Sequence, residues 1–399
     1  MIGSVSARIS RNALRSNIPV HCMMELTYRC NLLCIHCYRV EGDHKRDLST
    51  EEVTQTLDQL AAMGTLSVSF TGGEIFSRRD IFDILEHARR RRFAVTLFTT
   101  GTLLTQERVN RLQKLAMEEV HISVYGSTAA THEKITLIPG SFERSLNAIR
   151  MLRQSGIRVK IKCPLTKLNF HEYREIILLA RSLGTKYAID PIITPRTDGA
   201  RDPIALRISQ EQLEQVYSDP ILFPAVEESV QNPHNEVGDL ERAYEQIPCG
   251  AGHVSVNINP YGDVTPCVQM PIKLGNLREQ SFSEIWNHSQ RLVELRAIRV
   301  SDLQTCSSCE VLGHCSRCPG LALIEDGDIR GPAKACCSSA FAMKRVVEGA
   351  VKFQGRPAAI QDEKKETGVG ETTCGSHCSC GSRPDGEKLV QLGASRRVH

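Results

Sequence analysis

The sequence predicts an α/β protein in which a parallel sheet of six β/α units is followed by a small cysteine-rich domain. From Pro19 to about Ile193, short β-rich runs alternate with helical patterns, as expected for strands connected through helices. Cysteines in paired spacing gather after residue 249, and 399 residues are enough for two domains. Six units are too few for a closed eight-stranded barrel. The pattern therefore allows an open (β/α)6 barrel or a doubly wound sheet.

Each strand is expected where a short β-rich run lies between helical segments. These runs are Val20–Leu26, Leu66–Phe70, Ala94–Phe98, Val120–Val124, Arg158–Cys163 and Tyr187–Ile193. The first helix opens at Ser49-Thr50-Glu51-Glu52, which has the pattern of a capping box, and ends at Met63 before Gly64. Further helices are expected at Asp80–Arg92, Thr105–Met117, Ser141–Ser155, Asn169–Leu183 and near Ser209–Tyr217.

Composition divides the chain into five parts. We expect an N-terminal arm at 1–19, the β/α core at 20–200, a connector at 201–248, a cysteine-rich domain at 249–345 and a flexible tail at 346–399. The tail is rich in Gly, Lys, Glu and Ser with little periodicity, which predicts disorder. Its Cys374, Cys378, Cys380 and His377 are either metal ligands or redox-labile residues without a ligand role.

Charge and cysteine usage exclude several classes of protein. A net charge of +3 with mixed signs argues against nucleic-acid binding through a large basic field. No apolar stretch approaches the roughly 20 residues that span a bilayer, and the arm lacks the hydrophobic region of a secretory signal. Sixteen cysteines, many in Cys-x2-Cys pairs, indicate metal binding in a chain of this length. We expect a cytoplasmic protein with neither nucleic-acid nor membrane partners.

Cys30, Cys34 and Cys37 form a Cys-x3-Cys-x2-Cys run directly after the first predicted strand. Three thiolates at this spacing can bind three irons of a [4Fe–4S] cube and leave the fourth iron open to a substrate or cofactor. A zinc loop or three unrelated buried thiols are the alternatives. The run resembles the signature of radical S-adenosylmethionine (SAM) enzymes. That resemblance implies a cluster that reductively cleaves SAM to a 5′-deoxyadenosyl radical, and it selects the partial (β/α)6 barrel.

Candidate SAM contacts follow the next strands, where functional residues of β/α barrels gather. In Thr71-Gly72-Gly73-Glu74 the glycines let the backbone approach a ligand and Glu74 can accept from an ammonium. The resemblance implies that Gly72, Gly73 and Glu74 hold the SAM amino group. An ordinary tight turn is the alternative.

The resemblance assigns four further residues to SAM. Thr100 stands where related sequences often have Asn, His36 takes the position of a residue that lies against the adenine, and Ser123 and Arg144 bind the carboxylate. A guanidinium can hold a carboxylate through two hydrogen bonds, although Arg144 on a solvated helix face is the alternative. The carboxylates considered as a general base are Asp190 and Asp198.

The cysteine-rich region resembles the SPASM domain, which carries two auxiliary iron–sulfur clusters. Two residues, Ser316 and Arg317, separate Cys315 from Cys318 where the family pattern has three. The resemblance assigns Cys306, Cys309, Cys315 and Cys336 to the distal cluster and Cys249, Cys267 and Cys318 to the nearer one. The nearer cluster then has an open iron or a non-Cys ligand. Two alternatives remain, namely Cys337 in place of Cys336 and a zinc ribbon at Cys306, Cys309, Cys315 and Cys318.

SPASM enzymes mostly modify peptides or proteins, so the resemblance implies hydrogen abstraction from such a substrate, as in the maturation, crosslinking or oxidation of a ribosomal peptide. A reductant such as flavodoxin or ferredoxin is expected. The 1–19 arm is too short for a fused leader-binding domain, so a separate protein or the connector would bind a leader. The alternatives are an enzyme acting on a small molecule or cofactor precursor such as a tetrapyrrole, and a non-catalytic iron–sulfur electron-transfer protein.

Overall fold

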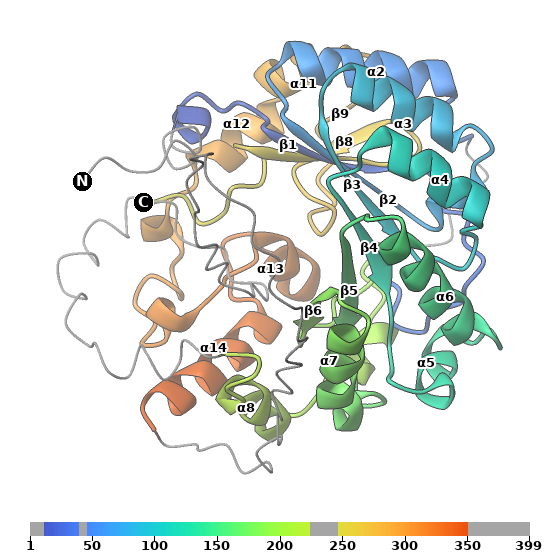
Figure 1. Ribbon diagram of the computed structural model, residues 1–399. Helices are drawn as coiled ribbons and strands as arrows, with labels where there is room; N and C mark the ends of the chain where they lie inside the picture. The colour runs from blue at the N-terminus through green and yellow to red at the C-terminus, as the bar shows by residue number, and fades with distance from the viewer. Residues whose placement is uncertain (1–11, 40–45, 224–245, 350–399) are drawn as a thin grey trace, which may run out of the picture.

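The computed structural model describes residues 12–39, 46–223 and 246–349 (Figure 1). The predicted tail from residue 350 onward, with Cys374, Cys378 and Cys380, lies outside these residues, as does most of the second half of the connector. Within the described ranges, no helix combines the length and the apolar character needed to cross a membrane.

One sheet of nine strands organises the molecule, in the order β6-β5-β4-β3-β2-β1-β7-β8-β9. Its first six strands are parallel: β1 (His21–Glu25), β2 (Ser67–Thr71), β3 (Ala94–Thr99), β4 (Glu119–Ser123), β5 (Val159–Pro164) and β6 (Lys186–Asp190). All six predicted strands are confirmed. The largest difference is at β6, which ends at Asp190, before Pro191, whose nitrogen cannot donate to a strand ladder.

The strand order decides between the two predicted architectures. Strands β1 to β6 follow one another in sequence without a reversal, whereas a doubly wound sheet reverses its order at a switch point. The outer helices are α2 (Thr50–Ala62), α3 (Ile81–Arg90), α4 (Gln106–Leu115), α5 (Ala129–Thr136), α6 (Ser141–Gln154) and α7 (Tyr173–Ser182). Figure 1 shows them along the same side of the sheet. The fold is therefore the open (β/α)6 barrel.

Local signals account for most of these helices. At the start of α2, Ser49 Oγ accepts from the Glu52 amide at 3.2 Å, and a Glu52 carboxylate oxygen accepts from the Ser49 amide at 2.7 Å. The capping box is confirmed. Helix α5 was not predicted. It has eight residues, and its N-cap Thr128 accepts from the Thr131 amide.

Alternate residues of the strands face two different environments. One face carries apolar side chains such as Val95, Leu97, Val120 and Ile122, which are completely buried against the outer helices. The opposite face, here called the inner face, carries more polar residues. On β3 to β6 these include Thr96, Glu119, His121, Ser123, Lys160, Lys162 and Asp190, and the same face carries the aromatic ring of Phe98.

The cysteine-rich region continues the same sheet. Strand β7 (Ser255–Ile258) pairs in parallel with β1, and β8 (Asp263–Thr265) and β9 (Gly275–Asn276) extend it as antiparallel strands. Further helices in the described residues are α8 (Gln210–Ser218), α11 (Phe282–His288), α12 (Gln290–Ala297), α13 (Pro319–Asp326) and α14 (Lys334–Val347). Short 3-10 helices occur at Ile75–Ser77, Phe170–Glu172, Asp202–Leu206, Val300–Asp302 and Leu312–His314. Helix α8 of the connector packs on α14.

Candidate functional site

The three predicted cluster thiols lie together on the loop that follows β1. Burial, followed by the neighbouring Cys37 and Cys30 thiols, raises the pKa of Cys34 to about 12. Burial also raises the pKa of Cys30, and Cys37 contributes to that rise. The structure therefore brings Cys30, Cys34 and Cys37 close enough to interact electrostatically. Because iron binds thiolates, loading this site must displace protons from these thiols.

The unpredicted helix α5 holds this cysteine loop. The Leu33 amide donates to the Thr136 carbonyl at 3.0 Å, and the Ile35 amide donates to the Ile135 carbonyl at 3.1 Å. On the other side, Asn31 Nδ2 donates to Thr102 Oγ1 at 2.8 Å. The loop is therefore fixed between the last turn of α5 and the segment that follows β3.

Arg39 is a functional candidate that sequence reasoning missed. Its guanidinium interacts electrostatically with Cys37 and Cys30 and donates to the Tyr28 carbonyl. A cation beside thiols favours their thiolate form. Arg196, from the segment after β6, donates to the Arg39 carbonyl at 3.1 Å. The position of an arginine two residues after Cys37 was the available signal.

Gly72 and Gly73 pack directly against the backbone of the cysteine loop. The Gly73 amide donates to the Thr27 carbonyl at 2.7 Å, and the next amide, of Glu74, donates to the Arg29 carbonyl at 2.9 Å. A Cβ at Gly72 would lie 2.3 Å from the Thr27 oxygen, and one at Gly73 would lie 2.1 Å from the Arg29 oxygen. The sequence predicted close approach to a ligand. In the structure, the neighbour that requires glycine is the protein backbone.

Glu74 is completely buried and its carboxylate accepts hydrogen bonds from protein donors. Thr100 donates through its amide at 2.8 Å and its hydroxyl at 2.6 Å, Thr99 donates through its hydroxyl at 2.7 Å, and the Phe76 amide donates at 3.0 Å. The carboxylate thereby ties the loop after β2 to the loop after β3. Thr100, which departs from the Asn common in related sequences, serves this connection with both of its donors.

The remaining predicted SAM residues have different surroundings. His36 lies edge-on to Tyr125 with ring centroids 4.6 Å apart, and burial lowers its pKa to about 4. Ser123 is the last residue of β4. Arg144 is exposed on α6, where its guanidinium donates to the Pro139 carbonyl at 3.2 Å. Among the described residues, no hydrogen bond joins Arg144 to Ser123.

The two aspartates considered as bases also differ. Asp198 is exposed and accepts from the Ala200 amide at 2.9 Å. Asp190, at the end of β6, is largely buried, and burial raises its pKa. Its Oδ1 accepts from the Ile192 amide at 2.9 Å. Of the two, only Asp190 lies on the inner face of the sheet.

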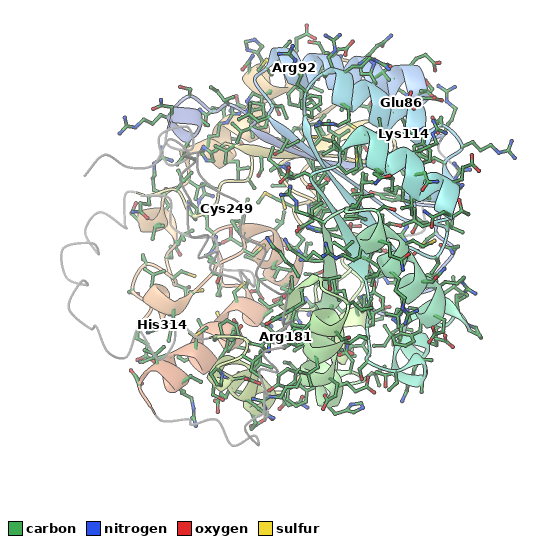
Figure 2. The ribbon with its side chains drawn as sticks, in the orientation of Figure 1. Glu86, Arg92, Lys114, Arg181, Cys249 and His314 are labelled. Atoms are coloured by element: carbon green, nitrogen blue, oxygen red, sulfur yellow. The ribbon has the colours of Figure 1, made fainter. Side chains whose placement is uncertain are left out.

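The first group of C-terminal cysteines consists of Cys249, Cys267 and Cys318. Burial, followed by the Cys249 and Cys318 thiols, raises the pKa of Cys267 to about 11. Figure 2 shows Cys249 between the sheet and the C-terminal helices. The predicted nearer set is thus brought together. The zinc-ribbon alternative instead places Cys318 with Cys306, Cys309 and Cys315. Across the described ranges, no three His, Cys, Asp or Glu side chains are arranged to hold a single metal ion.

The second group contains Cys306, Cys309 and Cys315, with Cys337 beside them. Burial, followed by Cys337, Cys306 and Cys309, raises the pKa of Cys315 to about 12. Burial also raises the pKa of Cys337, with Cys306 and Cys309 as the next contributors. Burial raises the pKa of Cys336 to about 12, and the thiols that add to this rise are Cys318 and Cys315. Adjacent residues of a helix point about 100° apart, so α14 directs these two thiols differently.

Comparison with known proteins gives two family matches. The profile of the radical SAM superfamily matches residues 24–180, and the SPASM profile, described as an iron-sulfur cluster-binding domain, matches residues 249–319. The first match covers the cysteine loop and β2 to β5 of the barrel and ends before β6, and the second covers most of the region that contains the C-terminal cysteines.

Relatives with two kinds of substrate resemble this chain. It is 30% identical over 320 residues to the PqqA peptide cyclase of Gluconobacter oxydans, covering 76% of this chain and 87% of that protein. It is 28% identical over 332 residues to the AdoMet-dependent heme synthase of Methanosarcina barkeri, covering 78% and 95% respectively. Among solved structures, Streptococcus suis SuiB bound to its precursor peptide SuiA has a TM-score of 0.63 at 17% identity and covers 84% of this chain and 82% of that one. At this identity the structural likeness shows the fold.

Proposed function

Because this chain belongs to the radical SAM superfamily and carries a SPASM iron–sulfur domain, we propose that it abstracts hydrogen from a peptide or protein substrate, as in the maturation, crosslinking or oxidation of a ribosomal peptide. The observation that carries the peptide assignment is the 30% identity to a peptide cyclase over most of both chains. Membership of an enzyme superfamily excludes the non-catalytic electron-transfer alternative. The cofactors of this protein are a [4Fe–4S] cluster, SAM and auxiliary iron–sulfur clusters.

The cysteine loop fits the first of these groups. Three interacting thiols lie beside the Arg39 guanidinium, and two buried polar atoms nearby, Asn31 Oδ1 and His36 Nδ1, have no partner among the described residues. Cys30, Cys34 and Cys37 would hold the cluster. When bound, the cluster supplies the electron that cleaves SAM to methionine and a 5′-deoxyadenosyl radical.

The chain's own residues would orient SAM. Gly72, Gly73 and Glu74 remain the proposed contacts of its amino group, and Ser123 and Arg144 those of its carboxylate. For Arg144 this requires the guanidinium to leave the Pro139 carbonyl, an exposed contact of small net value. Glu74 keeps the loops after β2 and β3 joined through its bonds to Thr99 and Thr100.

A second candidate substrate is a tetrapyrrole or a related cofactor precursor. The observation that favours it is the match to the M. barkeri heme synthase, which spans 95% of that protein at 28% identity. The two relatives match similar shares of this chain, 78% for the heme synthase and 76% for the peptide cyclase, so these matches do not discriminate between their substrates.

An assay of 5′-deoxyadenosine formation in the presence of a cell extract distinguishes the two candidate substrates. The reconstituted protein would be incubated anaerobically with SAM, dithionite and an extract of the source organism. If the substrate is a peptide, the extract stimulates 5′-deoxyadenosine formation above the level without extract. Treatment of the extract with a protease, which is inactivated before the assay, then removes the stimulation. Stimulation that survives digestion and stays in the small-molecule fraction contradicts the peptide assignment and favours the second candidate.

We also propose that Cys337 is the fourth ligand of the distal cluster, with Cys306, Cys309 and Cys315. Cys337 interacts electrostatically with both Cys306 and Cys309. Cys336 is 3% exposed, belongs to a buried cluster with Leu321 and Ala322, and interacts with Cys318 first and with Cys315 second. The resemblance assigned Cys336 to this cluster with Cys337 as the alternative, and the proposal chooses the alternative. Cys336 is then a buried side chain between the two cysteine groups.

The adjacent cysteines provide a matched pair of variants. Cys337→Ala is expected to lower the iron and sulfide bound per chain by up to the content of one cluster, because one cluster loses a ligand. Cys336→Ala is expected to keep the full content and to lose only packing stability, roughly 1 kcal/mol for a small buried side chain. Iron, sulfide and electron paramagnetic resonance measurements check both. Loss of iron in Cys336→Ala together with full loading of Cys337→Ala would reverse the assignment.

A further inference from the structure

The inner face of the barrel carries a row of charged side chains that belongs to neither the cysteine loop nor the predicted SAM contacts. In the strand register His121 on β4 pairs with Lys160 on β5, and Ser123 pairs with Lys162. Asp190 on β6 pairs with Pro164 on β5. Parallel sheets are usually covered on both faces and have largely apolar strands. Charges on this face therefore require an explanation other than packing.

Part of the row is internally paired. Glu119 Oε2 accepts from His121 Nε2 at 2.6 Å and from Lys160 Nζ at 2.8 Å, with the Glu119 and His121 side chains only 13% and 12% exposed. The two donors hold the pKa of Glu119 down at about 2 despite its burial. This carboxylate is therefore charged at neutral pH and compensates the Lys160 ammonium.

Two groups beside this triad are left without a protein partner. The Lys162 ammonium makes no hydrogen bond or ion pair among the described residues, although the carbonyl of this residue accepts from the Val124 amide at 3.1 Å. The charges that face it are Asp190, Lys160 and Glu119, and burial lowers its pKa. His121 donates from Nε2 to the charged Glu119, so its Nδ1 is an acceptor, and this atom is buried without a partner in the described part of the chain. A half-buried cation and a buried acceptor on neighbouring strands are costly unless a ligand satisfies them.

We propose that Lys162 and His121 form a binding site for a substrate carboxylate on the inner face of the barrel, with Lys162 Nζ donating to the carboxylate and His121 Nδ1 accepting from a nearby N–H or O–H of the same substrate. The inference rests on the proposed function, since it names a chemical feature of the substrate. An acidic side chain of a peptide and a propionate of a tetrapyrrole both present this chemistry.

The position of the site suits a substrate that is held beside SAM. Ser123, the register partner of Lys162, is the last residue of β4 and a proposed contact of SAM. His121 lies two residues earlier on the same strand and further into the sheet. The Phe98 ring packs against the His121 ring with centroids 4.5 Å apart and limits its rotation. A substrate bound here would lie next to the place where the proposed radical forms.

The test measures equilibrium binding of carboxylate probes to the reconstituted full-length protein in the presence of SAM. One pair is acetyl-Gly-Glu-Glu-Gly-Tyr-amide and its Gln-Gln counterpart, and the other is protoporphyrin IX and its dimethyl ester. In at least one pair, the wild type is expected to bind the carboxylate form about tenfold more tightly, the usual effect of a hydrogen bond between charged groups. Lys162→Met should remove the preference, and Lys162→Arg should retain part of it.

The matched control is Lys114→Met, which removes an exposed lysine on α4 (labelled in Figure 2) and should retain the preference. A preference in the peptide pair alone identifies an acidic peptide residue, and one in the porphyrin pair alone identifies a propionate. The inference is overturned if the wild type shows no preference in either pair. It is also overturned if Lys162→Met keeps the preference for the carboxylate form. The same holds if Lys162→Met keeps this preference and binds SAM more weakly than the wild type. Formation of 5′-deoxyadenosine by the wild type is measured in parallel, because its absence would count against the proposed function instead.

Discussion

Replacement of all three cysteines of the β1 loop, as Cys30→Ala/Cys34→Ala/Cys37→Ala, is expected to abolish the formation of 5′-deoxyadenosine from SAM. The three thiols are the proposed ligands of the cluster, and without a cluster no electron reaches SAM. The measurement is anaerobic incubation of the reconstituted protein with SAM and dithionite, followed by chromatographic quantification of 5′-deoxyadenosine. The variant should also bind less iron than the wild type by the content of one cluster.

A suitable control is Cys22→Ala, which removes a fully buried thiol on β1 that points to the outer-helix core. It should keep SAM cleavage and lose only about 1 kcal/mol of stability through the small cavity it creates. Equal amounts of 5′-deoxyadenosine from the wild type and the triple variant would refute the assignment of this loop. A fully loaded wild type that produces none, with or without extract, would count against the enzymatic reading itself.

Gly73→Ala is expected to reduce SAM cleavage by about 100-fold, the effect of displacing a catalytic group by about 1 Å. The added Cβ would lie 2.1 Å from the Arg29 carbonyl oxygen and 2.6 Å from its carbon. Both are backbone atoms immediately before Cys30, so the cysteine loop must move to accommodate the methyl group. The rate of 5′-deoxyadenosine formation and the iron content of the same preparation give the effect on chemistry and on cluster loading.

Gly313→Ala is the matched substitution, because a Cβ there meets nothing within 4 Å and the residue has no positive φ. It should leave the rate of SAM cleavage within twofold of the wild type. If Gly73→Ala is as active as Gly313→Ala, the close packing of the glycine segment on the cysteine loop is not what positions the thiols. If Gly73→Ala loses the iron of one cluster and keeps the auxiliary clusters, the damage lies in the β1 loop.

Local patterns predicted the barrel well because its elements depend on local signals. The capping box at Ser49 and the alternation of the six strands fixed the main elements to within a few residues. Helix α5 was missed because it has only eight residues, two of them threonines, and because it follows β4 where the outer helix was expected. That helix nevertheless supports the cysteine loop through the Thr136 and Ile135 carbonyls.

Prediction of the site was likewise accurate for residues that are close in sequence and incomplete for contacts between different loops. Spacing predicted Cys30, Cys34 and Cys37 as ligands, since ligands of one cluster on one loop are neighbours in sequence. It did not identify Arg39 as a partner of these thiols, and it did not show that Glu74 would be engaged by Thr99 and Thr100. Those contacts join residues from different loops, whose proximity depends on how the strands are ordered in the sheet.

By itself, the sequence determined the family chemistry and the order of β/α units, because cysteine spacing and hydrophobic periodicity are properties of short segments. The tertiary structure alone decided which side chains from different segments meet. It joined the C-terminal region to the barrel through the pairing of β7 with β1, brought Cys337 to Cys306 and Cys309, and placed Lys162 beside Ser123 on the inner face. Such long-range contacts depend on strand register and helix rotation, which are set by packing of the whole core and not by neighbouring residues.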